Sequence, residues 1–321
     1  MSNKVPAGVS FARPSVPFNR APRVVTASGV PVFAKSDAYT RNYDAIARSH
    51  LSSLERDGIN PFMSDETWHT LDASTLTILK QTVKAGDILL DAGVGLGRLL
   101  SAFPEHERYG VDIAFDYLDR TKRLGVHVAL ASLEELPYPD AAFDCVISTD
   151  VLEHVLDFYR ATREIERVLK PGGNFVLRVP LEEDMSVYYD YREFDYVHVR
   201  RFDLWSLRLH FERILGLEYV LDAPVLPTYR GASTSRLRPI EDREAVQNVL
   251  TALPQDLPGR AELMAFTGLT QEIFEAFMNA VSIHHPSDYN RLVALLAGYL
   301  EINMVFKKPP SPEGHRQRSN I

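Results

Sequence analysis

The spacing of apolar residues divides this chain into segments of different character. Between residues 88 and 221, short apolar runs of strand length alternate with segments in which apolar residues recur every three or four positions. These patterns predict strands at 88–91, 108–113, 126–131, 143–148, 174–179 and 217–221, and helices at 115–123, 157–169 and 203–215. A final apolar run predicts a strand at 302–306. The alternation favours an α/β fold with a doubly wound, mostly parallel sheet of about seven strands.

The segments on either side of this region follow other patterns. The first 35 residues hold five prolines and little periodicity, which predicts an extended arm or a flexible tail. Helical spacing predicts a helix at 38–56 capped by Asp37 and a second one after Ser64, which could cover the strand ends as a lid or pack on the sheet. Prolines interrupt the pattern from residue 224, and apolar stripes at 274–281 and 292–299 predict a helical insertion before the last strand.

These patterns predict four parts of the chain. Residues 1–82 form an N-terminal arm and helical lid, and residues 83–226 with 300–308 form the sheet domain. Residues 227–299 form the helical insertion, which would cap the substrate or mediate dimerisation. Residues 309–321 form a flexible, charged tail.

A glycine-rich turn follows the first predicted strand of the sheet. Asp91 ends that strand, and Gly93, Gly95 and Gly97 alternate with apolar residues before a helical pattern begins. A strand, a tight glycine turn and a helix form the nucleotide-binding corner of open α/β sheets. The third glycine comes one place too early for the dinucleotide fingerprint, and an acid at Asp91 suits a ligand with a positive charge and would repel a pyrophosphate. The turn therefore argues against a nicotinamide-dependent dehydrogenase.

A second acid ends the next predicted strand. Asp112 lies 21 residues beyond Asp91. A carboxylate at this place can accept hydrogen bonds from both hydroxyls of a ribose. The two acids and the turn together predict a site for a ribose-containing, positively charged ligand.

Five ordered motifs between residues 88 and 179 resemble those of class I S-adenosylmethionine-dependent methyltransferases, in the branch that methylates small molecules. They are the turn at 91–97, Asp112-Ile113, the block at 131–140, the pair of segments 144–148 and 151–155, and the turn at 167–173. The resemblance implies a Rossmann-like methyltransferase fold with S-adenosylmethionine as cofactor. It also implies that Ile113, Ser132, Leu133 and Asp150 line the cofactor site beside the two acids and three glycines. Many relatives carry an acid in place of Ser132, so adenine contact here would rest on backbone groups and Leu133.

Two histidines are candidate bases for activating an acceptor. His198 follows the fifth strand in a Tyr-rich loop that faces the acceptor side of this fold, and His154 follows the fourth strand. A hydroxyl acceptor needs such a base, whereas a carboxylate or amine acceptor needs little or none. In another interpretation Asp150, Glu153, His154 and His198 bind a divalent metal ion, as in some ubiquinone-pathway and small-RNA methyltransferases. Because the same string occurs in relatives without metal, we do not expect one.

Composition limits which kinds of partner and which cellular location we expect. A net charge of −8 argues against nucleic acid as a partner. A single cysteine, Cys145, allows no disulfide framework, and no apolar run reaches the length of a membrane span. These features predict a cytoplasmic protein without a membrane partner; a homodimer stays compatible with the sequence.

We therefore expect methyl transfer from S-adenosylmethionine to a polar small molecule, at a hydroxyl of a secondary metabolite or sugar. Tyrosines at 188, 189, 191 and 196 could line the acceptor pocket, and Arg192, Arg200 and Arg201 could meet an anionic group of the acceptor. Arg230, Arg236 and Arg238 are interpreted as solvated. The alternatives are metal-assisted O-methylation of a catechol, quinone precursor or RNA end, and a non-catalytic scaffold that binds the cofactor.

Overall fold

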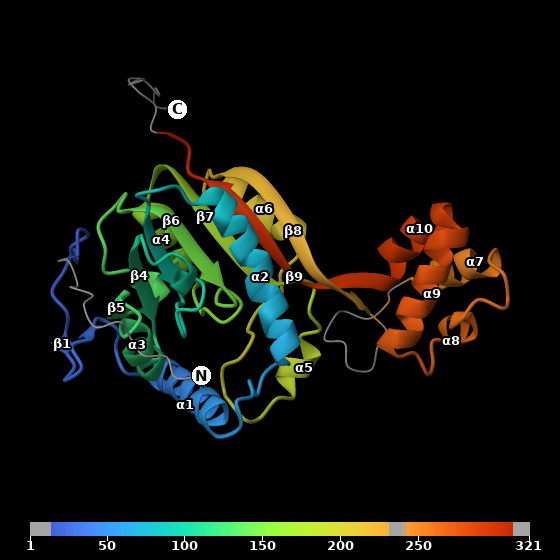
Figure 1. Cartoon of the computed structure of the whole chain (residues 1–321), viewed down its shortest axis with the longest axis horizontal. Helices are drawn as coiled ribbons and strands as arrows, with labels where there is room; N and C mark the ends of the chain where they lie inside the picture. The colour runs from blue at the N-terminus through green and yellow to red at the C-terminus, as the bar shows by residue number, and fades with distance from the viewer. Residues whose placement is uncertain (1–13, 231–239, 241, 311–321) are drawn as a thin grey trace, which may run out of the picture.

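A computed structural model describes residues 14–230, 240 and 242–310 of the chain. Within these residues a single sheet has nine strands in the order β1-β2-β5-β4-β3-β6-β7-β9-β8 (Figure 1). The strands are β1 (Val24–Val25), β2 (Pro31–Val32), β3 (Ile88–Ala92), β4 (Glu107–Asp112), β5 (His127–Leu130), β6 (Phe143–Thr149), β7 (Leu169–Pro180), β8 (Glu218–Tyr229) and β9 (Ala297–Lys307). Strands β2 to β7 pair in parallel, and β9 runs antiparallel between β7 and β8.

Helices cover both faces of the sheet, as the doubly wound prediction requires. The helices of the described residues are α1 (Ala38–Asp57), α2 (Asp65–Thr82), α3 (Phe115–Lys122), α4 (Phe158–Val168), α5 (Ser186–Tyr189), α6 (Leu204–Arg208), α7 (Arg243–Thr251), α8 (Arg260–Ala265), α9 (Gln271–His284) and α10 (Pro286–Leu296), of which α7 to α10 lie outside the layers on the sheet. In β3, Leu89 packs with α2 and α3 on one face, and Leu90 packs with α4 on the other. Successive residues face opposite sides because side chains alternate along a strand.

Seven of the nine strands are those predicted from the apolar pattern. The other two, β1 and β2, come from the N-terminal arm, where Val32 pairs with Leu130 of β5. The described part of the arm is extended, as predicted, and residues 1–13 lie outside the described residues. Strands of two residues leave no alternation to detect, because a period of two needs at least four positions.

Several boundaries differ from the prediction. Strand β9 begins at Ala297, inside the stripe predicted to be helical up to residue 299. The predicted turn around Gly172 belongs to β7, which begins at Leu169 beside Phe143 of β6. Strand β8 continues through Pro224 and Pro227 to Tyr229. Proline is tolerated there because β8 is the edge strand, where an absent N–H interrupts no ladder on the open side. The predicted helix at 203–215 is α6 followed by a π-helix, η3 (Leu209–Ile214).

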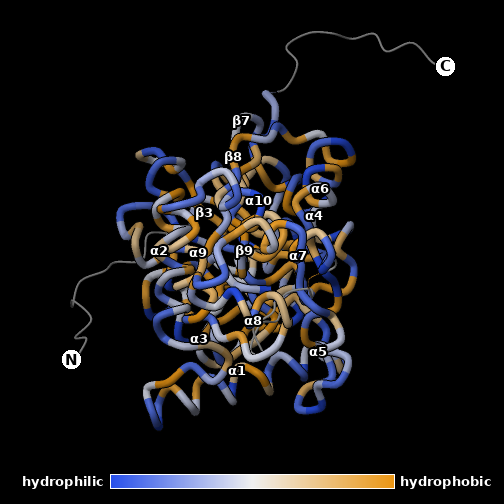
Figure 2. Tube along the Cα trace, turned by 90° about the vertical axis from the view of Figure 1, so that its right-hand side faces the viewer, coloured by the Kyte–Doolittle hydropathy of each residue, from blue (hydrophilic) through white to orange (hydrophobic). Residues whose placement is uncertain are grey.

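The helices α7 to α10 form the insertion predicted before the last strand. They surround an apolar cluster of their own, centred on Leu250, Phe277, Val281 and Leu292. In Figure 1 this unit lies at the far end of the long β8–β9 pair, away from the centre of the sheet. Seen end-on, its helices show alternating hydrophobic and hydrophilic positions (Figure 2). The predicted residues Arg236 and Arg238 lie outside the described residues.

The two N-terminal helices begin as predicted. Asp37 caps α1 in a capping box with Thr40, and the Ser64 hydroxyl accepts the Thr67 N–H at the start of α2. None of the helices in the described part of the chain combines the length and the apolar character needed to cross a bilayer.

Candidate functional site

A cavity of about 1120 Å³ lies at the carboxyl edge of the sheet. Its walls come from the ends of β3, β4 and β6, the loop after β7, helix α1 and the start of α2. Single-ligand pockets usually measure about 300–1,000 Å³, so this cavity can hold a cofactor beside a second molecule. The lining includes these predicted residues: Asp91, Gly93, Gly95, Asp112, Ile113, Ser132, Leu133, Asp150, Glu153, His154 and His198.

The glycine turn is shaped by close contacts behind it. Gly93 has a φ of +100°, and a Cβ there would lie 2.1 Å from Val151 Cγ2. Gly97 also has a positive φ, of +69°, but it does not line the cavity. A Cβ at Gly97 would lie 2.8 Å from Thr121 Cγ2, so this glycine permits close packing against α3 rather than ligand contact. The prediction that Gly97 contacts the cofactor therefore finds no support in the cavity lining.

Asp112 is held directly below the turn. Its Oδ2 accepts the Gly95 N–H at 2.9 Å, and its Oδ1 accepts the Ala114 N–H at 2.9 Å. Each oxygen keeps a further lone pair, since a carboxylate oxygen accepts more than one hydrogen bond. The carboxylate is therefore oriented and can still accept two hydroxyls.

Asp91 is a buried acid without a counter-ion of its own. Only 3% of the residue is exposed, and its Oδ1 has no hydrogen-bond partner. Burial, with a smaller contribution from Asp112, raises the pKa of Asp91 to about 8. Such an unpaired buried carboxyl group is costly, and a positive charge placed beside it would remove the cost.

Ser132 and Leu133 line the cavity at the start of the short helix η2 (Leu133–Glu135). The Ser132 hydroxyl accepts the Glu134 N–H at 3.1 Å and caps this short helix. Leu133 is buried, at 5% exposed. An apolar residue beside a hydroxyl that can still donate suits the edge and face of a flat heterocycle.

Sequence reasoning missed the arginine at the floor of the cavity. Arg178 of β7 is 1% exposed and forms ion pairs with Asp150 at 2.5 Å and Glu301 of β9 at 2.6 Å. It also donates to Thr75 Oγ1 of α2 at 2.9 Å. The available signal was an arginine within the apolar run 175–179, because a buried arginine requires partners.

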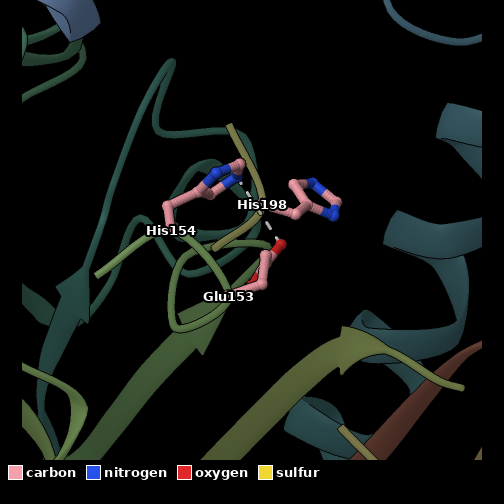
Figure 3. A group of neighbouring side chains, drawn as sticks. All are labelled: Glu153, His154 and His198. Atoms are coloured by element: carbon pink, nitrogen blue, oxygen red, sulfur yellow. Dashed lines mark ion pairs between the residues drawn. The ribbon is translucent and has the colours of Figure 1, made fainter. Parts of the chain in front are cut away.

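Glu153, His154 and His198 also line the cavity and lie close together (Figure 3). One carboxylate oxygen of Glu153 and one ring nitrogen of each histidine lie within 4.8 Å of one another. Glu153 is 1% exposed, both of its oxygens lack a hydrogen-bond partner, and Oε1 lies 3.7 Å from His154 Nε2. Burial raises the pKa of Glu153, and burial with the neighbouring His198 lowers the pKa of His154 to about 3.

Asp150 does not join this group among the described residues. Its carboxylate is directed to Arg178, whose charge holds the pKa of Asp150 below its usual value against the effect of burial. Of the four residues considered as possible metal ligands, Glu153, His154 and His198 therefore lie together, whereas Asp150 lies against Arg178.

His198 has a carboxylate partner that sequence reasoning also missed. Its Nδ1 lies 2.7 Å from Glu183 Oε2, and the Tyr188 hydroxyl donates to the other oxygen of Glu183. The Tyr188 ring stacks on the imidazole, with ring centroids 4.4 Å apart. Glu183 is buried, so the carboxylate fixes the ring and can stabilise its protonated form.

The arginines expected to meet an anionic acceptor do not line the cavity. Arg200 donates to the carbonyl oxygens of Val155 and Leu156, and Arg192 donates to the Tyr189 carbonyl at 2.6 Å. Of the four predicted tyrosines, 188 and 191 line the cavity, whereas 189 and 196 do not. Aromatic residues of α1, Tyr39 and Tyr43, contribute to the wall instead.

Comparisons with known proteins agree with this site. Residues 90–177 match the family model described as a methyltransferase domain. Over 132 residues the chain is 33% identical to dimethylglycine N-methyltransferase of Parasynechococcus marenigrum, covering 38% of this chain and 45% of the relative. Over 164 residues it is 31% identical to the ubiquinone/menaquinone biosynthesis C-methyltransferase UbiE of Hahella chejuensis, covering 46% of this chain and 61% of the relative. The match thus spans about half of the length of these curated relatives.

A solved structure shares the fold at low sequence identity. The cyclase SpnF aligns with a TM-score of 0.51 and 19% identity over 93% of this chain and all of its own. This likeness concerns the fold alone. Residues 90–177 are therefore similar to a methyltransferase domain, and this part of the chain holds the glycine turn with Asp91 and Asp112.

Proposed function

We propose that this protein transfers a methyl group from S-adenosylmethionine to a hydroxyl of a polar small molecule. One observation carries the proposal: a single cavity holds the glycine turn with Asp91 and Asp112 on one side and the Glu183–His198 pair on the other. A donor and an acceptor bound side by side turn a bimolecular reaction into a step within one complex.

The donor side fits the cofactor. Asp112 would accept the ribose hydroxyls, and the unpaired carboxyl group of Asp91 would lie toward the positively charged methionine end. Ser132, Leu133 and Ile113 would enclose the adenine, and the bare backbone at Gly93 and Gly95 leaves room for close approach. Bound S-adenosylmethionine supplies a methyl carbon whose bond to sulfur breaks, with its electron pair left on sulfur, as the acceptor oxygen attacks.

The acceptor side supplies the base. With Nδ1 donating its proton to Glu183, His198 presents an unprotonated Nε2 that can take the proton of a hydroxyl. Glu183 then stabilises the imidazolium. His154 stays neutral and lies edge-on to His198, with ring centroids 4.7 Å apart, so we assign it to positioning that ring.

A metal-assisted reaction is the second candidate, favoured by the group Glu153, His154 and His198. A buried acid beside two imidazoles suits a divalent transition metal ion. The carboxylate of Glu183 on the far nitrogen of His198 matches the way metal-binding histidines are usually oriented. Metal analysis after chelation, with activity measured on the stripped and reloaded enzyme, separates the two candidates.

Helix α1 and the loop after β7 are proposed as a cover over the cavity. The Tyr39 hydroxyl donates to the His154 carbonyl at 3.1 Å. The Asn42 amide bonds with the backbone of Tyr196 at 2.8 Å and of Asp195 at 2.9 Å. We further propose that the helical unit at 227–299 caps the acceptor or mediates dimerisation.

The test separates binding from turnover. Calorimetry with S-adenosylmethionine and S-adenosylhomocysteine should show binding to the wild type, and labelled methyl groups should pass to hydroxylated acceptors. Absence of cofactor binding would overturn the proposal. Binding without turnover on a broad panel of acceptors would favour the non-catalytic scaffold.

A further inference from the structure

The cavity is lined by far more acidic than basic side chains. Among the described residues that line it, nine are acidic and two are arginines. Both arginines are already paired: Arg98 with Asp72 at 2.7 Å, and Arg178 with Asp150 and Glu301. The other carboxyl groups in the wall have no arginine partner among the residues that line the cavity.

Two of the histidines in the wall do not compensate this charge. Burial lowers the pKa of His50 to about 4, and His154 Nε2 lies 3.7 Å from Glu153 Oε1, beyond hydrogen-bond distance. The cofactor would bring one net positive charge to the side of Asp91 and Asp112. This leaves Glu153, on the acceptor side, as a buried carboxyl group without a counter-ion.

The surroundings of Glu153 suit an organic cation. Tyr43 packs edge-on against the His154 ring, with centroids 5.7 Å apart, and Tyr39 packs against Tyr43 at 4.9 Å. Tyr39, Tyr43 and Tyr188 all line the cavity near this acid's neighbours, His154 and His198. Aromatic faces combined with a carboxylate are the usual means of recognising alkylammonium groups.

The spacing between Glu153 and His198 defines the ligand further. Their polar atoms lie within 4.8 Å of each other, so groups on adjacent carbons of one molecule can reach both. We propose that the acceptor is a hydroxylated amine, an amino alcohol or amino sugar, whose ammonium group lies against Glu153 while the adjacent hydroxyl lies against His198. This inference rests on the proposed function and replaces the expected anionic acceptor, because the arginines meant to bind it do not line the cavity.

A matched pair of small probes tests the proposal. Ligand-observed NMR would measure binding of trans-2-aminocyclohexanol and of trans-1,2-cyclohexanediol to metal-free protein saturated with S-adenosylhomocysteine, at pH 7. We expect the amine to bind about tenfold more tightly than the diol, from one partly desolvated charge interaction. Glu153→Gln should remove this preference and leave diol binding unchanged.

Two further variants keep the result interpretable. Glu193→Gln removes the same unit of charge from an exposed acid at the cavity wall and should keep the preference. Glu153→Asp retains the charge and should keep most of it. The affinity of each variant for S-adenosylhomocysteine, measured by calorimetry, shows whether the fold is intact. If Glu153→Gln does not fold, the preference of the wild type for the amine over the diol decides the proposal, and equal binding overturns it.

The outcomes distinguish this inference from the proposed function. Equal binding of amine and diol, with the cofactor product bound normally, would overturn the charge inference and leave methyl transfer standing. Failure to bind S-adenosylhomocysteine would count against the proposed function itself. If MnCl₂ alone binds the wild type but not Glu153→Gln, and the diol then binds more tightly than the amine, Glu153 belongs to a metal site and the ammonium proposal is wrong.

Discussion

Replacing Asp91 by asparagine would test whether the cofactor supplies the missing counter-ion of the turn. The substitution keeps the shape of the side chain and removes its charge. Asp91 is 3% exposed, its Oδ1 lacks a partner, and burial raises its pKa to about 8. The wild-type carboxyl group should therefore be largely protonated at neutral pH in the free protein.

The raised pKa determines the sign of the stability effect. Between pH 4 and 8 the native state binds a proton that the unfolded state has released, so the stability of the free protein contributed by this group falls as pH rises. A shift from 3.8 to about 8, at about 1.4 kcal/mol per pH unit, sets an upper limit of roughly 6 kcal/mol above pH 8. The Asp91→Asn variant has no charge to bury at this position, so it should be more stable than the wild type at pH 9 when both are free of ligand.

Cofactor binding should show the opposite preference. If the ionised form binds the cationic cofactor, wild-type affinity should rise about tenfold from pH 6 to 7, somewhat less from pH 7 to 8, and level off above pH 8. Asp91→Asn should bind more weakly at pH 9 and lose this dependence. Calorimetry with S-adenosylmethionine from pH 6 to 9 and thermal unfolding of the free proteins measure both effects. A flat wild-type affinity together with no gain in stability for the variant would refute the reasoning.

The remaining predictions concern the turn and the base. Asp112→Ala should weaken cofactor binding by at least about tenfold, from the loss of two hydrogen bonds to the ribose, and calorimetry should detect it. His198→Ala should lower kcat by about a hundredfold or more while cofactor affinity changes little, and full activity would remove His198 from catalysis. Glu183→Gln should lower kcat by about tenfold with little change in cofactor affinity, because His198 loses the carboxylate that orients its ring. Gly93→Ala should destabilise the fold by several kcal/mol in chemical denaturation, since its Cβ would overlap Val151 at a positive φ; unchanged stability would contradict the close approach of the turn to Val151.

The order of the sheet and its glycine turn followed from local patterns. Apolar runs predicted seven strands, because a strand that is covered by helices on both faces of the sheet needs apolar side chains on both sides. Asp91 and Asp112 could be placed together from sequence, because the carboxyl ends of adjacent parallel strands meet at one edge. Caps at Asp37 and Ser64 were predictable for the same reason, since a helix start is recognised within four residues.

Pairings between distant segments could not be read in this way. Val32 pairs with Leu130 because β5 leaves a free edge in the folded sheet. Pro224 is accepted in β8 because β8 is the last strand at the other edge and has no further strand to pair with. Arg200 was expected in the acceptor pocket, but nearby carbonyl oxygens take its N–H groups instead. Arg230 was expected to be solvated, but it pairs with Glu182 at 2.5 Å. Spacing along the chain does not say which of several acceptors a long side chain will reach.

The sequence alone determined the fold class, the position of the glycine turn and the two acids around it, because each depends on contacts within a strand, a turn or adjacent strands. Only the tertiary structure decided how the acids are used. In the folded chain Asp150 pairs with Arg178, and His198 lies against Glu183. Asp91 and Glu153 are buried without counter-ions. These outcomes depend on burial and on neighbours tens of residues away, which a local pattern does not contain.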